Sequence, residues 1–199
     1  MSGALRIASI VEGHGEVHGL PELLRRICQE RHGVWADVPR PHRIPRSSMI
    51  EHPEMLAKAV RFQARRVQQG GVIILLDSDD DDPEMLRASV QACVAESGAQ
   101  VPAIAAVAVR EYEAWFLAGA ASLRGHQSVL DDAHYDNDPE APRDAKGRLE
   151  KLMLEHYDSI RHQVAFNSRL DLDIAEQRSP SFARFLVAVA AIVGSPEQR

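Results

Sequence analysis

The sequence predicts an α/β fold: a mainly parallel, Rossmann-like sheet flanked by helices, with a helical C-terminal extension. Apolar runs alternate with helical patterns in the first part of the chain, which is typical of an open sheet with right-handed crossovers. Beyond that part a polar stretch gives way to helical patterns. We expect an α/β core over 1–123, a polar loop over 124–145 and a helical extension over 146–199 that packs on the core within a single domain.

Short apolar runs mark the predicted strands. Leu5 to Val11 ends at Glu12-Gly13, and Val72 to Leu76 holds five consecutive branched apolar residues. Such a run is typical of a central parallel strand that is covered on both faces. Pro102 to Val109 predicts another buried strand, and Val34 to Val38 a short one.

Helical periodicity separates these runs. From Gly19 the apolar residues Leu20, Leu23, Leu24 and Ile27 share one face. The other predicted helices and loops follow from caps, prolines and glycines: a Pro- and Arg-rich loop over Pro39 to Ser48, a helix over Pro53 to Val67 closed by Gly70-Gly71, a helix over Pro83 to Glu96, a long mobile loop from Arg124 to Ala145, and helices over Lys146 to His156 and Ser181 to Val193, the last capped by Ser179 or Ser181.

Composition limits the class of protein. The chain has 199 residues, of which 45% are hydrophobic and 26% charged, as in a soluble globular protein. No apolar run is long enough to cross a bilayer, and the N-terminus lacks the features of a signal peptide. Cys28 and Cys93 fit buried thiols in a reducing cytoplasm. The net charge of -6 argues against a simple nucleic-acid coat protein but not against a nucleic-acid enzyme.

Acidic residues follow three of the predicted strands. Glu12 follows the first, Asp77 follows Val72 to Leu76, and Glu111 with Glu113 follows the strand ending at Val109. Ligands bind outside the carboxyl ends of the strands in an open parallel sheet, and Mg²⁺ prefers carboxylate oxygens. The strand order therefore predicts a metal site suited to phosphodiester chemistry.

A Glu-Gly pair after a first strand, with Asp77-Ser78-Asp79 after a later one, resembles the Toprim domain of primases, topoisomerases and OLD-family nucleases. The resemblance implies that Glu12 acts as general acid or base. It also implies that Asp77 and Asp79 position Mg²⁺ or Mn²⁺.

A narrower resemblance covers nearly the whole chain. The segments VEGHGE, ILLDSDDDD, REYEAWFLA and LDLDIAEQRSPSFARFL are similar to a small bacterial Toprim family of unknown function, some of whose members resemble nuclease effectors of antiphage defence that work with an ATPase partner. This implies that Glu16 and Glu113 also bind metal and that Lys146 is catalytic. The chain itself has no G-x-x-x-x-G-K-[ST] sequence, so the ATPase half is absent from it.

Several neighbouring residues have both a functional and a structural interpretation. His14 and the arginines of the Pro-rich loop fit contacts with substrate phosphate, because guanidinium pairs well with phosphate, but they also fit solvated loops. Acids before a helix stabilise its N-terminus, and Asp82-Pro83 fits an N-cap with Pro at N1. We assign that structural role to Asp80, Asp81 and Asp82. The candidate substrate-binding residues are His14, Arg40, Arg43 and Arg46.

Three functions compete. The leading hypothesis is a Mg²⁺-dependent Toprim nuclease that cleaves RNA or DNA in the cytoplasm. A phosphatase of the haloacid dehalogenase type also uses Asp-x-Asp, but there the pair follows the first strand. The third is a non-catalytic or partner-activated metal-binding subunit of an ATPase complex. An appended apolar helix is also compatible with a homodimer, and no membrane partner is expected.

Overall fold

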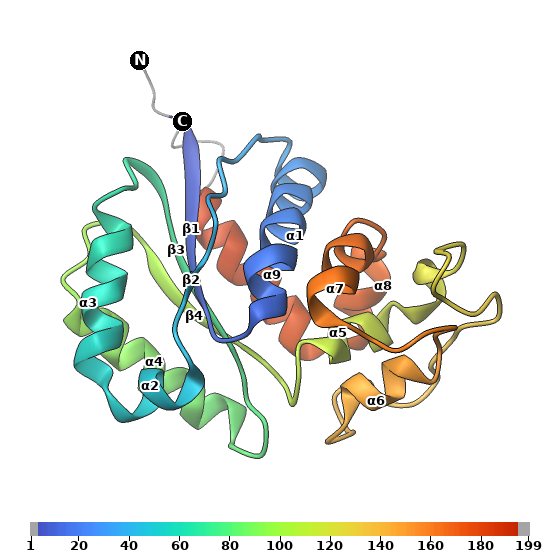
Figure 1. The fold of residues 1–199 in the computed structure, drawn as a ribbon. Coiled ribbons are helices and arrows are strands. Elements are labelled where there is room, and N and C mark those ends of the chain that lie inside the picture. Colours follow the sequence, from blue (N-terminus) through green and yellow to red (C-terminus); the bar gives the residue numbers. More distant parts are fainter. Residues whose placement is uncertain (1–3, 195–199) are drawn as a thin grey trace.

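A four-stranded sheet, parallel throughout and ordered β2-β1-β3-β4, forms the centre of the computed structural model, which describes residues 4–194 (Figure 1). This confirms the predicted α/β class with a parallel sheet. The strands are β1 (Leu5–Val11), β2 (His42–Arg43), β3 (Gln69–Asp77) and β4 (Ala103–Ala108).

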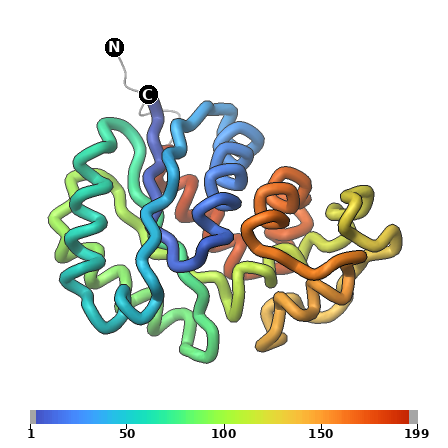
Figure 2. Tube along the Cα trace, viewed as in Figure 1, coloured from blue at the N-terminus to red at the C-terminus, as the bar shows by residue number. Residues whose placement is uncertain are grey.

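Helices cover both faces of the sheet. In Figures 1 and 2, α2, α3 and α4 lie on one side, α1 and α9 lie on the other, and α5 to α8 extend beyond α1. None of the helices described is both long and apolar enough to cross a membrane. The helices are α1 (His14–His32), α2 (Arg46–Glu51), α3 (Pro53–Ala64), α4 (Pro83–Glu96), α5 (Glu113–Ala118), the 3-10 turn η1 (Ala120–Leu123), α6 (Ala145–Glu150), α7 (Ser159–Asn167), α8 (Leu172–Arg178) and α9 (Pro180–Val193).

The apolar run of β3 is buried on both faces, as its sequence predicts. Successive side chains of a strand point to opposite faces of the sheet. Ile73 and Leu75 therefore enter the core beneath α1 and α9, whereas Val72, Ile74 and Leu76 enter the core beneath α3 and α4. Each of the five is 0–1% exposed. β3 thus contributes to both cores, as do its neighbours β1 and β4.

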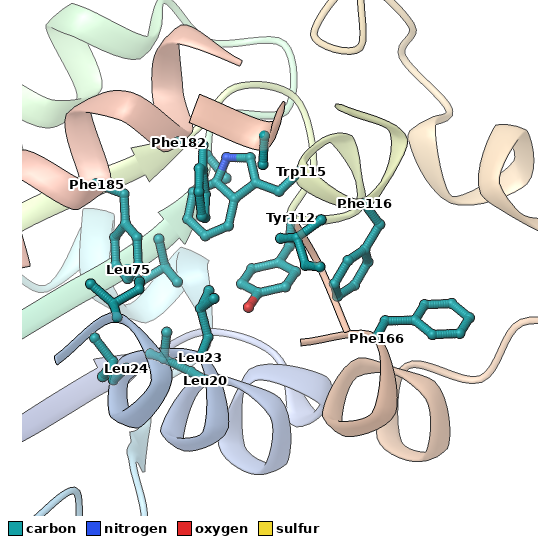
Figure 3. Packing of buried hydrophobic residues seen from close by; sticks show 14 of the residues in the cluster. Leu20, Leu23, Leu24, Leu75, Tyr112, Trp115, Phe116, Phe166, Phe182 and Phe185 are labelled. Carbon is teal, nitrogen blue, oxygen red and sulfur yellow. The ribbon is translucent and has the colours of Figure 1, made fainter. Parts of the chain in front are cut away.

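Aromatic residues of α5 and α9 fill the larger core (Figure 3). The ring of Trp115 lies 5.2 Å from that of Phe182 and 4.9 Å from that of Phe185, measured between centroids. Its indole N–H donates to Ser181 Oγ at 2.8 Å. Trp115 and Phe116 are fully buried, so they belong to the core. These contacts fix α9 against α5.

Two glycines allow α7 to pack closely on α1. A Cβ atom at Gly15 would lie 2.7 Å from Gln163 Cδ, and a Cβ at Gly19 would lie 2.7 Å from Gln163 Cβ. Asn167 Nδ2 donates to the carbonyl of Gly19 at 2.9 Å. The absence of a side chain at both positions thus lets α7 lie where it does.

The prediction of a short strand over Val34 to Val38 is wrong. Asp37 makes only an isolated bridge with Arg6, and the strand that pairs with the end of β1 is β2, inside the predicted loop of Pro39 to Ser48. Pro39 and Pro41 separate these two contacts. Proline lacks the N–H that a continuous ladder needs, so the pairing breaks and resumes. Arg46, also placed in that loop, instead begins α2.

The helix predicted over Lys146 to His156 is shorter than expected. α6 spans Ala145–Glu150, with Asp144 as its N-cap. The next residues pair instead with the segment before α6: Leu130 N donates to Leu152 O at 3.0 Å, and Leu154 N donates to Ser128 O at 2.8 Å. These long-range hydrogen bonds replace the helical ones.

The bounds of the other predicted helices lie closer to those observed. α4 matches its predicted bounds, and Ser179, one of the two predicted caps, accepts from Phe182 N. α1 begins at His14 rather than Gly19, and α3 ends at Ala64. Between η1 and α6 no helix or strand occurs, as predicted, although Val129 and Ala133 are buried. Two helices, α7 and α8, were not predicted individually; Asp158 and Asp171 cap them.

Substituting Gly19→Ala should destabilise the protein, although alanine normally stabilises a helix interior relative to glycine by ~1 kcal/mol. The added methyl would overlap Gln163 Cβ, which belongs to a buried side chain and has no room to withdraw. We expect a loss of about 1–3 kcal/mol, typical of overpacking, in urea unfolding. The exposed neighbour His18→Ala is the control and should be neutral or slightly stabilising.

Candidate carboxylate site

Five carboxylates from different elements meet at the carboxyl edge of the sheet. Glu12 directly follows β1, Asp77 ends β3, Asp79 lies two residues further, Glu16 lies in the first turn of α1 and Glu113 begins α5. The other four are near enough to Asp77 to raise its pKa through their charge. The structure therefore brings together all five predicted acidic residues.

Burial and mutual repulsion make these groups poor acids. The pKa of Glu12 rises to about 7, mainly because it is buried and also because Glu16 and Asp79 lie close by. Burial likewise raises the pKa of Asp77 well above its usual range, and the charge of Glu12 adds to the effect. Among the described residues, no donor reaches the buried atoms Glu12 Oε2 and Glu16 Oε2. Such unpartnered carboxylate oxygens are costly unless a ligand satisfies them.

Gly13 leaves the space that the Glu16 carboxylate occupies. A Cβ atom at this position would lie 2.0 Å from Glu16 Oε2. The Glu-Gly pair thus has a steric function: the glycine admits a second carboxylate beside that of Glu12.

A strained turn holds Asp79. Asp79 and Arg110 are the non-glycine residues with positive φ in the described chain, at 48° and 64°. Asp79 N donates to Arg110 O at 3.0 Å, and Arg110 N donates to the buried Ser78 Oγ at 2.8 Å. Positive φ costs about 1–3 kcal/mol where it is sparsely populated and persists only when its surroundings impose it. The ends of β3 and β4 are therefore locked together beside the site.

Arg46 spans the acidic turn. Its Nε lies 3.5 Å from Asp79 Oδ2, and its guanidinium also pairs with Asp81. Nε further donates to the carbonyl of Asp77 at 3.2 Å. Of the predicted loop arginines, Arg46 is the one that the structure places at the site.

Arg110 and Arg143 converge on a single carboxylate oxygen. Asp80 Oδ1 accepts from Arg110 at 3.0 Å and lies 3.1 Å from Arg143 Nε. Asp82 caps α4 by accepting from Met85 N, and Asp81 pairs with Arg46. The prediction that Asp80, Asp81 and Asp82 stabilise the start of a helix is confirmed for Asp82, the N-cap of α4. Asp80 and Asp81 instead form ion pairs.

Lys146 reaches the site from α6. Its Nζ lies 4.0 Å from Glu113 Oε1, and Glu113 raises the pKa of the ammonium group. Burial raises the pKa of Glu113, and Lys146 partly opposes that effect. Lys146 N also donates to Glu111 Oε2 at 2.8 Å, which ties the start of α6 to the end of β4.

His14, Arg40 and Arg43 are exposed and form no ion pair or side-chain hydrogen bond with another described residue. The sequence predicts His14 in a loop, but it is the first residue of α1. The geometry does not link Arg40 or Arg43 to the carboxylates.

Sequence reasoning missed Gln163 in α7. Its amide nitrogen lies 3.2 Å from Glu16 Oε1 and 3.4 Å from Glu113 Oε1. Nothing local indicates this role, because it depends on how closely α7 packs on α1.

The donor set suits a hard divalent cation, although no ready cage exists. Across residues 4–194, no three His, Cys, Asp or Glu side chains are arranged to hold an ion. Mg²⁺ usually takes one or two carboxylates and keeps several waters, and it prefers oxygen donors such as those gathered here. The unpartnered oxygens of Glu12 and Glu16 fit such a group.

Substituting Glu12→Gln should stabilise the metal-free protein at pH 8. The pKa of Glu12 is about 7 in the folded chain and 4.5 in the unfolded chain, so the folded protein holds the proton more tightly. This preference stabilises the fold in full below pH 4.5, where the carboxyl is protonated in both states. That contribution is lost as the pH rises through 7. We expect the free energy of unfolding of the variant to exceed that of the wild type by up to about 3 kcal/mol at pH 8, since one pKa unit is ~1.4 kcal/mol. At pH 4.5 the difference should be small. Urea unfolding in EDTA measures this.

The matched control for that experiment is Glu96→Gln, at the exposed far end of α4. An equal gain at pH 8 from Glu96→Gln, or no gain from Glu12→Gln, would contradict the repulsion described here.

A protein-family model matches residues 11–190, from the end of β1 to within α9; its description is "Domain of unknown function (DUF4276)". The match includes every acidic residue of the site, together with Lys146 and Gln163. Comparisons with curated proteins and with solved structures found no match. Because the family model spans most of the sequence, the chain belongs to the DUF4276 family.

Proposed function

We propose that this protein is a Toprim-type nuclease that uses Mg²⁺ or Mn²⁺ to cleave phosphodiester bonds in RNA or DNA in the cytoplasm. The observation that carries the proposal is the convergence of Glu12, Glu16, Asp77, Asp79 and Glu113 at one sheet edge, with buried oxygens that lack a partner. A cluster of this kind is unstable without positive charge. A divalent cation supplies that charge and is the cofactor that such chemistry requires.

Asp77 and Asp79 would hold the ion, together with Glu16 and Glu113 as the resemblance implies. When bound, the ion would polarise the phosphodiester and favour deprotonation of an attacking water. Glu12 has a pKa of about 7, so its carboxyl can both take and return a proton near neutral pH. This supports a general acid–base role for Glu12.

Basic side chains at the rim would bind the phosphate. Lys146 stays cationic because Glu113 raises its pKa, and its half-exposed ammonium group is accessible to substrate. Arg46 carries a guanidinium suited to phosphate, next to Asp79. We propose that Lys146 stabilises charge on the scissile phosphate and that Arg46 binds the backbone. His14 lies near enough along the chain to Glu12 to contact a flanking phosphate.

A partner-activated or purely regulatory metal-binding subunit is the second candidate. One observation favours it: Arg46, Arg110, Arg143 and Lys146 each already face a carboxylate of this chain. Nucleic acid would have to compete with those ion pairs, so affinity in isolation should be low. A partner such as an ATPase, or a second copy of the chain, would then complete the substrate surface.

An endonuclease assay tests the leading proposal. Purified protein is incubated with a tRNA pool, single-stranded DNA and supercoiled plasmid in Mg²⁺, Mn²⁺ or EDTA. We expect cutting that depends on metal and falls by at least ~100-fold in Asp77→Asn, because that substitution removes a ligand charge at the centre of the cluster. Circular dichroism checks that the variant remains folded.

Asp37→Asn is the control, because Asp37 pairs with Arg6 at the opposite edge of the sheet. It should cut as the wild type does. Cutting that survives both Asp77→Asn and Glu12→Gln would refute the nuclease proposal. A folded, metal-binding wild type that cuts nothing, even with a candidate partner ATPase, would favour the regulatory subunit.

Divalent metal should also stabilise the protein against heat. A ligand at 100 times its Kd adds ~2.7 kcal/mol if it binds only the folded state. We therefore expect saturating Mn²⁺ to raise Tm by about 5–10 °C in a domain of this size. The increase should shrink below pH 7, where Glu12 holds its proton. Differential scanning fluorimetry of the wild type and Asp77→Asn measures it, and an equal increase in both would exclude metal binding at Asp77.

A further inference from the structure

Gln163 carries a buried amide that spans two carboxylates of the site. The residue is 0% exposed, and its Nε2 lies 3.2 Å from Glu16 Oε1 and 3.4 Å from Glu113 Oε1. The two acids come from α1 and α5, whereas Gln163 comes from α7, in the C-terminal part of the chain. One neutral side chain thus connects two acidic residues that the sheet does not hold together.

The packing around Gln163 is specific to its position. Gly15 and Gly19 clear the space that its side chain occupies, since a Cβ at either would come within 2.7 Å of it. This α1–α7 contact therefore determines where the amide lies relative to the carboxylates.

The chemistry of an amide suits the task of holding two anions. Its NH₂ group has two donors and can serve one carboxylate with each. It ties one oxygen of each acid, and Glu16 Oε2 remains without a partner. A lysine here would neutralise the acids and compete with a cation, whereas an amide fixes them and leaves their charge intact.

We propose that Gln163 is a positioning residue for the metal-binding carboxylates: it orients Glu16 and Glu113 so that their remaining oxygens can take a divalent cation. This inference rests on the proposed metal site. It extends the site into the C-terminal part of the chain and assigns α7 a role in metal affinity. Groups that orient metal ligands typically change affinity about 10–100-fold when they are removed.

Asn167, one helical turn further along α7, provides the matched control. It is equally buried and packs on the same face of α1, where it donates to Gly19 O at 2.9 Å and accepts from the Tyr112 hydroxyl at 3.1 Å. Its hydrogen-bond partners are Arg26, Tyr112 and Gly19, and none of the five carboxylates of the site is among them. If Gln163 had a purely structural role, substituting Gln163 and substituting Asn167 should change Mn²⁺ affinity in the same way.

The test compares Gln163→Met, which keeps the volume but loses both donors, with Asn167→Leu. Mn²⁺ binding is titrated by electron paramagnetic resonance on the full chain, and stability is measured by urea unfolding. We expect Gln163→Met to weaken Mn²⁺ affinity by ~10-fold or more. Asn167→Leu should lose stability but keep the wild-type affinity. Gln163→Leu, which also lacks both donors and adds no charge, should weaken the affinity to a similar extent.

Equal Mn²⁺ affinity in folded Gln163→Met and the wild type would overturn the positioning role, as would an equal loss in Asn167→Leu. If Gln163→Met fails to fold, the titration is made on Gln163→Leu and judged in the same way. A wild type that binds no Mn²⁺ would overturn both this inference and the metal site. A wild type that binds Mn²⁺ in a Gln163-dependent way but cuts no nucleic acid would overturn the nuclease proposal alone.

Discussion

Repulsion among carboxylates at one edge of a parallel sheet is the constraint on which the rest of this structure depends. Parallel strands deliver their carboxyl ends to the same edge, so the acids after β1 and β3 cannot avoid each other. The raised pKa values of Glu12 and Asp77 express that cost. The surrounding structure offsets it with two apolar cores, one on each face of the sheet, to which β1, β3 and β4 all contribute side chains. A site that costs stability and is kept by a rigid scaffold is typical of functional sites.

The C-terminal part of the chain belongs to this site as well as to the core. Its last helix, α9, packs Phe182 and Phe185 against Trp115, and so fixes α5, which begins with Glu113. α6 and α7 bring Lys146 and Gln163 to the same carboxylates. The family model spans both parts.

The acidic turn after β3 combines strain with charge pairing. Positive φ at Asp79 and Arg110 persists because the Asp79 N–H donates to the Arg110 carbonyl and the Arg110 N–H donates to the buried Ser78 hydroxyl. The ion pairs of Arg46, Arg110 and Arg143 with this turn offset some of its negative charge. Under the proposed function, nucleic acid would have to compete with the carboxylates for these same guanidinium groups. Exposed pairs of this kind are weak, so a polyanion or a partner protein can replace them.

The sequence by itself determined the features that depend on local pattern. The apolar runs of β1 and β3, the capped helix α4, and the acids that directly follow two strands can be identified from residue order, because side-chain periodicity and strand ends are local properties. Only the tertiary structure decided the rest. β2 formed at His42–Arg43 rather than at Val34 to Val38 because prolines interrupted its pairing with β1. α6 stopped at Glu150 because distant segments supplied other hydrogen bonds. Gln163 joined the site because two glycines on α1 admitted α7, a contact between residues about 150 positions apart that no local pattern encodes.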